Sequence, residues 1–340
     1  MAKHVIIPIF IPHVGCPHDC IFCNQAKITG QLREEYDKIT GNQVRKTIED
    51  YLETIDRVNT TVEVSFFGGT FTAIDIRKQR ELLQSARTAK EDGLVDFIRL
   101  STRPDYINLP IMNHLKEYSV DIVELGVQSL SQDVLDRAKR GYRKETVAHA
   151  SSLIREFGMT LGHQLMIGLP LDTEEKDMMS LRESIEMKPD LVRIYPSLVI
   201  RDTEMEEDYE RGTYIPYTLD EAVRISANMM KAYEENGVKV IRIGLQTTEE
   251  INSGADVLGG PFHPAFRELA ESYLLCERIS EAGFRTLQVN IGKRDLSKLY
   301  ADKKRYFNPL LGRMNIQVII LEKSLEKIIE IVNLEDGSVL

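Results

Sequence analysis

The chain has 340 residues, of which 42% are hydrophobic and 28% are charged, values that are ordinary for a soluble globular protein. No apolar run approaches the roughly 20 residues that a membrane-spanning helix needs, and two prolines in the apolar N-terminal stretch argue against a secretory signal. The net charge of −10 argues against broad coating of nucleic acid, although a local basic patch is compatible with it.

Apolar, β-prone segments alternate with amphipathic helical segments through most of the chain. We expect strands at residues 4–10, 61–67, 96–101, 120–127, 159–168 and 190–197. We expect helices near residues 41–58, 75–92, 110–118, 131–157 and 174–187. This alternation predicts βαβ units and a parallel sheet. Six repeats of roughly 30 residues each favour an α/β fold with a partial (β/α)6 TIM-like barrel.

The character of the sequence changes near residue 250. A helix at about 218–236 and a short strand at 237–245 continue the alternation, but residues 252–264 are rich in Gly and Pro. A helix at about 264–283, a strand at 286–292, a basic segment and a β-prone tail follow. We therefore expect a core domain at residues 1–250 and a small C-terminal α+β extension of unknown role at residues 251–340.

Distinctive residues follow the ends of five predicted strands. The loops contain a cysteine-rich segment at residues 15–24, "GGT" at 68–70, "STRPD" at 101–105, "GVQS" at 126–129 and "GLP" at 168–170. Because functional groups of such barrels gather at the carboxyl ends of the strands, we expect these loops to meet at one mouth.

Three of the four cysteines, Cys16, Cys20 and Cys23, have the spacing C-x3-C-x2-C. Thiolates are soft ligands that suit zinc or iron–sulfur clusters. A zinc-stabilised RNA-binding module would need a fourth ligand, such as His13 or His18, and a redox pair would need only two cysteines. Three ligands on a 4Fe-4S cluster leave one iron open, and the surrounding loops favour that interpretation. The clustering does not resemble a disulfide framework, which indicates a reducing compartment, the cytoplasm.

The C-x3-C-x2-C motif at the end of a first strand resembles the signature of the radical S-adenosylmethionine (radical SAM) superfamily, and residues 1 to about 245 fit that family throughout. The resemblance implies that the three cysteines hold a 4Fe-4S cluster and that S-adenosylmethionine binds its open iron. Reduction of the cluster would then cleave the cofactor to a 5′-deoxyadenosyl radical. It also implies an electron donor such as flavodoxin or ferredoxin.

Two of the other loops supply further candidate cofactor contacts. In "FFGGT", Gly68 and Gly69, followed by Thr70, let the backbone approach a ligand closely, and the family counterpart receives the methionine amino group. A tight strand-to-helix turn is the structural alternative. Ser101 lies at the next strand end, where a polar group could hold ribose or make an ordinary structural hydrogen bond.

Four further residues complete the predicted cofactor site. Glu124 and Gln128 lie in "ELGVQS" and could contact ribose and carboxylate or act structurally. Arg140 occupies the place of an arginine that grips the cofactor carboxylate in related enzymes, and an exposed helix-end arginine is the alternative. "HQLMIGLP" matches a motif that packs against adenine, although many relatives have an acid at the position of Gln164.

The stretches "GGTFT", "STRPDY", "ELGVQS" and "YPSLVIRDTEM" resemble the radical domain of the Elongator catalytic subunit family, which modifies wobble uridine in tRNA. That family has a longer gap between its first two cysteines and an acetyltransferase domain, for which the last 90 residues here are too few. A second resemblance is to anaerobic coproporphyrinogen oxidase and its haem-chaperone relatives, which share the short cysteine gap, "GVQS" and "GLP".

Residues 292–307 form a basic segment with six Lys or Arg against two Asp, interleaved with Tyr300, Tyr306 and Phe307. Such a segment can bind the phosphates and bases of tRNA or another RNA. Alternatively, it is a surface helix whose aromatic side chains pack on the core. We expect Cys276, the remaining cysteine, to be a buried core residue rather than a ligand.

Overall fold

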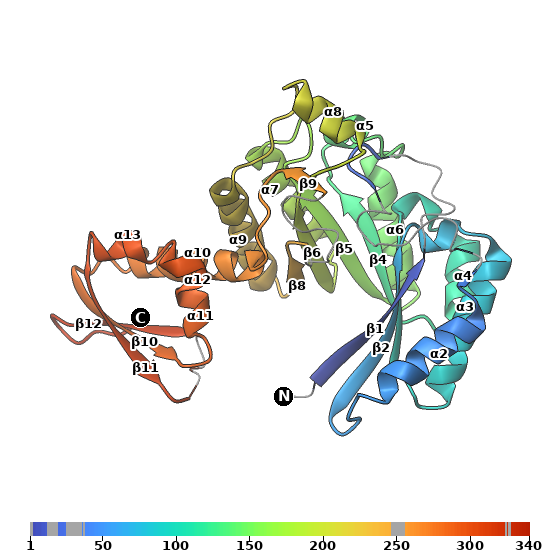
Figure 1. Ribbon diagram of the computed structural model, residues 1–340, viewed down its shortest axis with the longest axis horizontal. Helices are drawn as coiled ribbons and strands as arrows, with labels where there is room; N and C mark the ends of the chain where they lie inside the picture. The colour runs from blue at the N-terminus through green and yellow to red at the C-terminus, as the bar shows by residue number, and fades with distance from the viewer. Residues whose placement is uncertain are drawn as a thin grey trace.

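A curved parallel sheet forms the larger part of the protein. The computed structural model describes residues 3–11, 20–24, 36, 38–245, 256–323, 325 and 328–340. Within these ranges, seven parallel strands pair in the order β1-β2-β3-β4-β5-β6-β8. Their bounds are β1 (Lys3–Ile11), β2 (Thr60–Gly68), β3 (Phe97–Thr102), β4 (Ile122–Gln128), β5 (Thr160–Ile167), β6 (Leu191–Pro196) and β8 (Lys239–Ile243). Figure 1 shows the sheet curled into a half-barrel, which confirms the predicted fold class.

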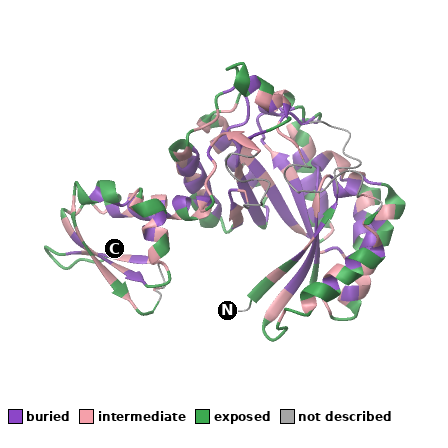
Figure 2. Cartoon of the chain, in the orientation of Figure 1, coloured by how far each residue is buried: buried purple, intermediate pink, exposed green. Residues whose placement is uncertain are grey.

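Helices between the strands cover the outer face of the half-barrel (Figure 1). The helices of this part are α2 (Gly41–Leu52), α3 (Ile76–Glu91), α4 (Leu109–Glu117), α5 (Gln132–Arg137), α6 (Lys144–Glu156), α7 (Glu174–Glu186), α8 (Glu204–Glu210) and α9 (Leu219–Glu235), with short 3₁₀ turns η2 (Phe71–Ala73) and η3 (Pro104–Tyr106). The short helices α5 and α8 lie at the upper rim of the half-barrel in Figure 1. On α3, the buried residues Leu82, Leu83 and Ala86 repeat at helical spacing and pack against the sheet. Figure 2 shows the result, with buried residues on the strands and exposed residues on the outer sides of the helices.

The segment 131–157 differs from the prediction of one continuous helix. It forms two helices, α5 and α6, because Lys139 (φ 54°) and Gly141 (φ 72°) adopt left-handed backbone conformations between them. A right-handed helix does not contain such residues in its interior. The break directs Arg140 and Tyr142 into the protein, where both side chains are buried.

A second, three-stranded sheet lies beside the half-barrel (Figure 1). In it, β10 (Thr286–Gly292) pairs in parallel with β11 (Asn315–Leu321) and antiparallel with β12 (Ile329–Asn333). The helices here are α10 (Phe266–Glu281), α11 (Leu296–Leu299), α12 (Ala301–Lys304) and α13 (Asn308–Leu311). No helix within the described ranges combines the length and the apolar character that crossing a membrane requires.

Helix α10 takes part in the cores of both sheets. Phe266 and Leu269, in its first turns, are buried in the cluster that contains α9 and β6, whereas Leu275 and Ile279 are buried with β10 and β12. A short antiparallel pair, β7 (Val199–Ile200) with β9 (Val257–Gly259), joins the segment before α10 to the half-barrel. The domain boundary near residue 250 therefore stays a prediction.

Candidate functional site

A cavity of about 670 Å³ opens on the inner face of the half-barrel. Five of the predicted site residues line it: Cys23, Gly68, Ser101, Gln128 and Gln164. They come from the segment after β1, from the last residues of β2, β3 and β4, and from the middle of β5. The structure thus brings together residues that the sequence places on five separate loops and strands.

Cys20 and Cys23 lie on one tight turn, in which the backbone N–H of Cys23 donates to the carbonyl of Cys20 at 2.9 Å. The turn is held on both sides, because Ile21 N donates to Ala138 O at 3.4 Å and Met205 N donates to Ile21 O at 2.9 Å. Two thiols on a fixed turn beside a cavity fit the ligand role that the spacing predicts. Cys16, His13 and His18 lie outside the described residues.

Two buried arginines contact the sulfur of Cys20. Arg140 Nη1 lies 3.2 Å from Cys20 Sγ, and Arg103 Nη1 lies 3.8 Å from it. The Arg140 guanidinium also donates to Tyr142 Oη at 3.1 Å and to Gly126 O at 2.5 Å. Burial disfavours its charge, but neighbouring Tyr142 and Cys20 raise the pKa of Arg140 above its ordinary value, so it is cationic. Arg140 therefore lies behind the cysteine turn and off the cavity wall.

Gly68 is the residue at which β2 reaches the end of β1. Its φ is +113°, and a Cβ atom there would lie 2.0 Å from the carbonyl oxygen of Ile11. Only glycine can occupy this position without moving one of the strands. Gly69 N donates to the same carbonyl at 3.4 Å, and buried Thr70 precedes η2, so these two predicted residues adjoin the cavity without lining it.

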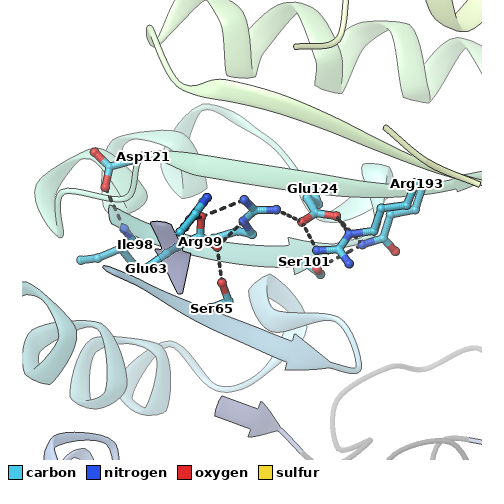
Figure 3. A network of polar contacts seen from close by, with 10 residues as sticks. Glu63, Ser65, Ile98, Arg99, Ser101, Asp121, Glu124 and Arg193 are labelled. Atoms are coloured by element: carbon cyan, nitrogen blue, oxygen red, sulfur yellow. Dashed lines mark hydrogen bonds and ion pairs between the residues drawn. The ribbon is translucent and has the colours of Figure 1, made fainter. Parts of the chain in front are cut away.

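A row of buried charges crosses the inner face of the sheet (Figure 3). Arg99 on β3 lies between two carboxylates, donating to Glu63 Oε2 at 2.8 Å and to Glu124 Oε1 at 2.5 Å. Arg193 on β6 donates to Glu124 Oε2 at 2.6 Å and also lines the cavity. Two cations and two anions alternate, so each buried charge has an opposite neighbour, which the interior requires.

The predicted residues Glu124, Gln164 and Ser101 form one hydrogen-bonded group. The amide of Gln164 donates to Glu124 Oε2 at 2.9 Å and to Ser101 Oγ at 3.2 Å. Burial would raise the pKa of Glu124, but Arg193 and Arg99 together hold it below its usual range, so the group is a carboxylate. Glu124 itself is fully buried and does not line the cavity; it binds Gln164 and Arg193, which do.

Sequence reasoning missed Glu63, Arg99 and Arg193, although a signal was present. Each is the single charged residue of its strand and lies between two apolar neighbours, in "VEV", "IRL" and "VRI". An isolated charge in a buried strand needs a partner of opposite sign on a neighbouring strand. The repetition of this pattern could have predicted a charged row across the sheet.

The basic segment 292–307 spans α11 and α12 beside α9. Phe307 is buried, and Tyr306 donates to Asp220 Oδ1 at 2.9 Å, so these aromatic side chains pack on the protein. Arg305 makes two hydrogen bonds with the Asp220 carboxylate, at 2.8 and 3.0 Å. The side chains of Arg294 and Lys303 are exposed. Cys276 is buried in the core beneath β10, as expected.

Comparison with known proteins identifies two matching family models. The model described as "Radical SAM superfamily" matches residues 10–182, and the model described as "Radical_SAM C-terminal domain" matches residues 189–275. The first covers half of the chain.

Among curated relatives, a tRNA uridine(34) acetyltransferase of Methanocaldococcus jannaschii is 30% identical over 255 residues, which are 65% of this chain and 47% of that protein. Elongator complex protein 3 of Homo sapiens is 25% identical over 320 residues, which are 82% of this chain and 57% of that protein. The chain spans about half the length of the curated relatives it matches.

Solved structures show the same fold. Elp3 of the archaeon Methanocaldococcus infernus, with an N-terminal deletion, superposes with a TM-score of 0.63 at 23% identity, over 82% of this chain and 64% of that chain. Coproporphyrinogen III oxidase (HemN) of Escherichia coli gives a TM-score of 0.51 at 19% identity, over 69% of this chain and 52% of that chain.

Proposed function

Because the chain belongs to the radical SAM superfamily, whose enzymes use a 4Fe-4S cluster and S-adenosylmethionine, we propose that it modifies tRNA or another RNA. A bound cluster and S-adenosylmethionine together supply a 5′-deoxyadenosyl radical. The observation that carries the RNA proposal is the similarity to tRNA uridine(34) acetyltransferases over 65% of this chain. We place the enzyme in the cytoplasm, where tRNA is available and thiols stay reduced.

The proposed cofactor site uses the residues around the cavity. Cys16, Cys20 and Cys23 would hold the cluster, and Cys23 faces the cavity directly. Gly68, Ser101, Gln128 and Gln164 would contact S-adenosylmethionine, since their backbone or polar side chains line the same space. Gly68 lines the cavity and has no side chain, so a ligand there would meet its backbone.

Two predicted cofactor residues have more specific proposed roles. Glu124 would act through Gln164 and Ser101, because its carboxylate is already bound by Arg99 and Arg193. Arg140 would complement the negative charge of the cluster through Cys20 Sγ, since it is cationic, lies against that sulfur and lies off the wall of the cavity.

The proposed RNA contact lies in the basic segment. Arg294 and Lys303 have exposed side chains there, whereas Arg305 is paired with Asp220. The phosphates of RNA bind cations that are not already paired with a carboxylate. The proposal therefore rests on Arg294 and Lys303 and not on Arg305. An electron donor such as flavodoxin or ferredoxin would reduce the cluster.

The test is anaerobic reconstitution with iron, sulfide and S-adenosylmethionine, followed by incubation with dithionite and a tRNA pool. We expect a modified nucleoside, found by mass analysis, that requires both S-adenosylmethionine and dithionite. Cleavage of S-adenosylmethionine without any modified nucleoside, and without tRNA affinity at low salt, would contradict the RNA proposal and favour a small-molecule substrate. If the protein holds one zinc ion and no iron, it does not work as a radical enzyme with an iron–sulfur cluster.

A further inference from the structure

We propose that Arg103 and Asp105 set the reduction potential of the iron–sulfur cluster through the sulfur of Cys20. Neither residue belongs to the predicted cofactor contacts, and both lie in the loop after β3. The inference rests on the family's 4Fe-4S cluster and on Cys20 as one of its ligands. It does not depend on which molecule the enzyme modifies.

The side chain of Arg103 is fixed in one orientation. It is buried, with only 4% of its surface exposed. Its Nε and Nη2 atoms bind the two oxygens of Asp105 at 2.9 and 3.0 Å, and Nη2 also donates to the carbonyl of Arg140. Because two sides of the planar guanidinium are held in this way, the remaining nitrogen, Nη1, is directed at Cys20 Sγ, 3.8 Å away.

The sulfur of Cys20 lies among more cations than anions. Arg103 and Arg140 are two cations that face the same Tyr142 ring, with guanidinium carbons 5.3 and 5.1 Å from its centre. Asp105 supplies one negative charge. Among the residues that the structure describes, no carboxylate forms an ion pair with Arg140. Among the described residues, this group therefore holds two cations and one carboxylate, and both cations contact the sulfur of Cys20.

Cations beside a ligand sulfur stabilise the reduced cluster. Reduction adds one electron, taken from an external donor, and no bond or proton moves. Because the added negative charge lies in a buried region, where charges interact strongly, each neighbouring cation favours the reduced form and each neighbouring anion disfavours it. Hydrogen bonds to cluster sulfurs act in the same direction. Loss of Arg103 should lower the potential, and loss of the Asp105 charge should raise it.

The two residues should shift the midpoint potential of the cluster in opposite directions, which a merely structural role would not do. The full chain is reconstituted anaerobically, and its iron and sulfide contents are measured. The midpoint potential of the cluster is then determined by a redox titration without S-adenosylmethionine, followed by electron paramagnetic resonance. For Arg103→Gln we expect the ratio of reduced to oxidised cluster at the wild-type midpoint to fall about tenfold, which is about 59 mV for one electron. For Asp105→Asn we expect a shift of the same order to higher potential. Arg103→Lys, which keeps the charge, should recover part of the loss.

Arg143→Gln is the matched control, because Arg143 lies three residues beyond Arg140 but is exposed and pairs with Glu145. We expect the wild-type potential for it. Wild-type potentials in cluster-loaded Arg103→Gln and Asp105→Asn, or shifts of the same sign in both, would overturn the proposal. If Arg103→Gln does not hold iron, Arg103→Lys and Asp105→Asn decide the question: an unchanged potential in both would overturn it.

Discussion

Cys20 and Cys276 are both buried thiols, but their surroundings differ. Cys20 contacts two guanidinium groups on a turn next to the cavity. Cys276 lies among apolar side chains of α10 and β10, and burial raises its pKa to about 12. A thiol on a turn beside two cations suits metal binding, whereas a thiol that stays protonated in a hydrophobic core behaves as a small apolar residue.

We therefore expect Cys20→Ala and Cys23→Ala to lose the brown chromophore after anaerobic reconstitution, since a three-cysteine site has no ligand to spare. Cys276→Ala should keep it. Iron and sulfide analysis of each purified variant measures the outcome. Wild-type iron and sulfide in the Cys20→Ala variant would show that this thiol is not a ligand.

Two buried acids lie close together near the end of β5: Asp172 in the loop after that strand and Asp177 in the first turn of α7. Burial and the charge of Asp172 raise the pKa of Asp177 well above its usual range, and Tyr217 donates to its Oδ2 atom at 2.9 Å. Burial likewise raises the pKa of Asp172 to about 6. The folded protein thus retains a proton that the unfolded chain releases above about pH 4, so stability falls as the pH rises from there.

Asp177→Asn removes this titration and keeps an acceptor for Tyr217. From pH 5 to pH 8, we expect the free energy of unfolding of the variant to rise relative to that of the wild type. The rise should exceed about 1.4 kcal/mol, the equivalent of one pKa unit. Urea unfolding at both pH values measures it. Asp50→Asn, at an exposed position of α2, should leave the pH dependence unchanged. Equal pH dependence in wild type and Asp177→Asn would contradict a raised pKa.

Single residues of the site could be predicted from sequence where a local motif placed them. Gln128 and Ser101 line the cavity because each ends or nearly ends a strand whose period-2 pattern is readable. The role of Arg103 could not be predicted in this way, because its sulfur partner is 83 positions away in the chain. Only the three-dimensional packing of the two loops brings Cys20 and Arg103 into contact.

At the scale of elements, the parallel strands followed from apolar β-prone runs, and the structure adds what such runs do not encode. The two-residue β7 and three-residue β9 are too short for any period and exist only because they pair with each other. The break between α5 and α6 also escaped prediction, since α5 has only 6 residues and its end depends on two left-handed residues.

The junction of β1 and β2 gives an element-scale prediction. Gly68→Ala should strongly destabilise the protein or displace the end of β1, because its Cβ would lie 2.0 Å from Ile11 O. Gly93→Ala is the control: Gly93 also has a positive φ, +72°, but no atom lies within 4 Å of the added methyl group. We expect it to cost only about 1–2 kcal/mol, from the left-handed backbone alone. Thermal unfolding of both variants compares them, and equal losses would show that the close contact is relieved at little cost.

At the scale of the whole molecule, an ion pair joins the smaller sheet to the half-barrel. Asp220, in the first turn of α9, binds Arg305 through both oxygens and accepts from Tyr306. The Tyr306 ring in turn packs edge-on against Tyr273 of α10, with centroids 5.5 Å apart. The contact links the basic segment to the body that contains the cavity.

We expect Arg305→Ala to loosen this junction. Partly exposed ion pairs contribute about 0.2–1 kcal/mol, so amide exchange in α11 and α12 should accelerate up to several-fold. Hydrogen–deuterium exchange measures it, and the double variant Asp220→Arg with Arg305→Asp should restore protection. Arg57→Ala, which breaks an ion pair with Asp96 in the half-barrel, should not affect α11 or α12. If amide exchange in α11 and α12 is unchanged in Arg305→Ala, apolar packing alone holds the smaller sheet to the half-barrel.

The contact between Arg305 and Asp220 also limits which residues can be replaced to test RNA binding by the basic segment. Because Arg305 holds the segment in place, its removal would mix loss of charge with loss of position. Arg294→Ala with Lys303→Ala removes two exposed cations without that contact. Each phosphate contact that is lost lowers the dependence of log affinity on log salt by about 0.7–0.9, so the slope for tRNA should fall by about 1–2.

The control replaces two exposed cations on the outer helices, Lys46→Ala with Arg80→Ala, and changes the net charge equally. Filter binding of tRNA between low and moderate salt measures all three proteins. If only the Arg294–Lys303 variant shows the smaller slope, the phosphates contact this segment. Equal slopes in both variants would mean that tRNA responds to the overall charge of the protein, and the segment would then be a surface feature of the smaller sheet without a role in binding.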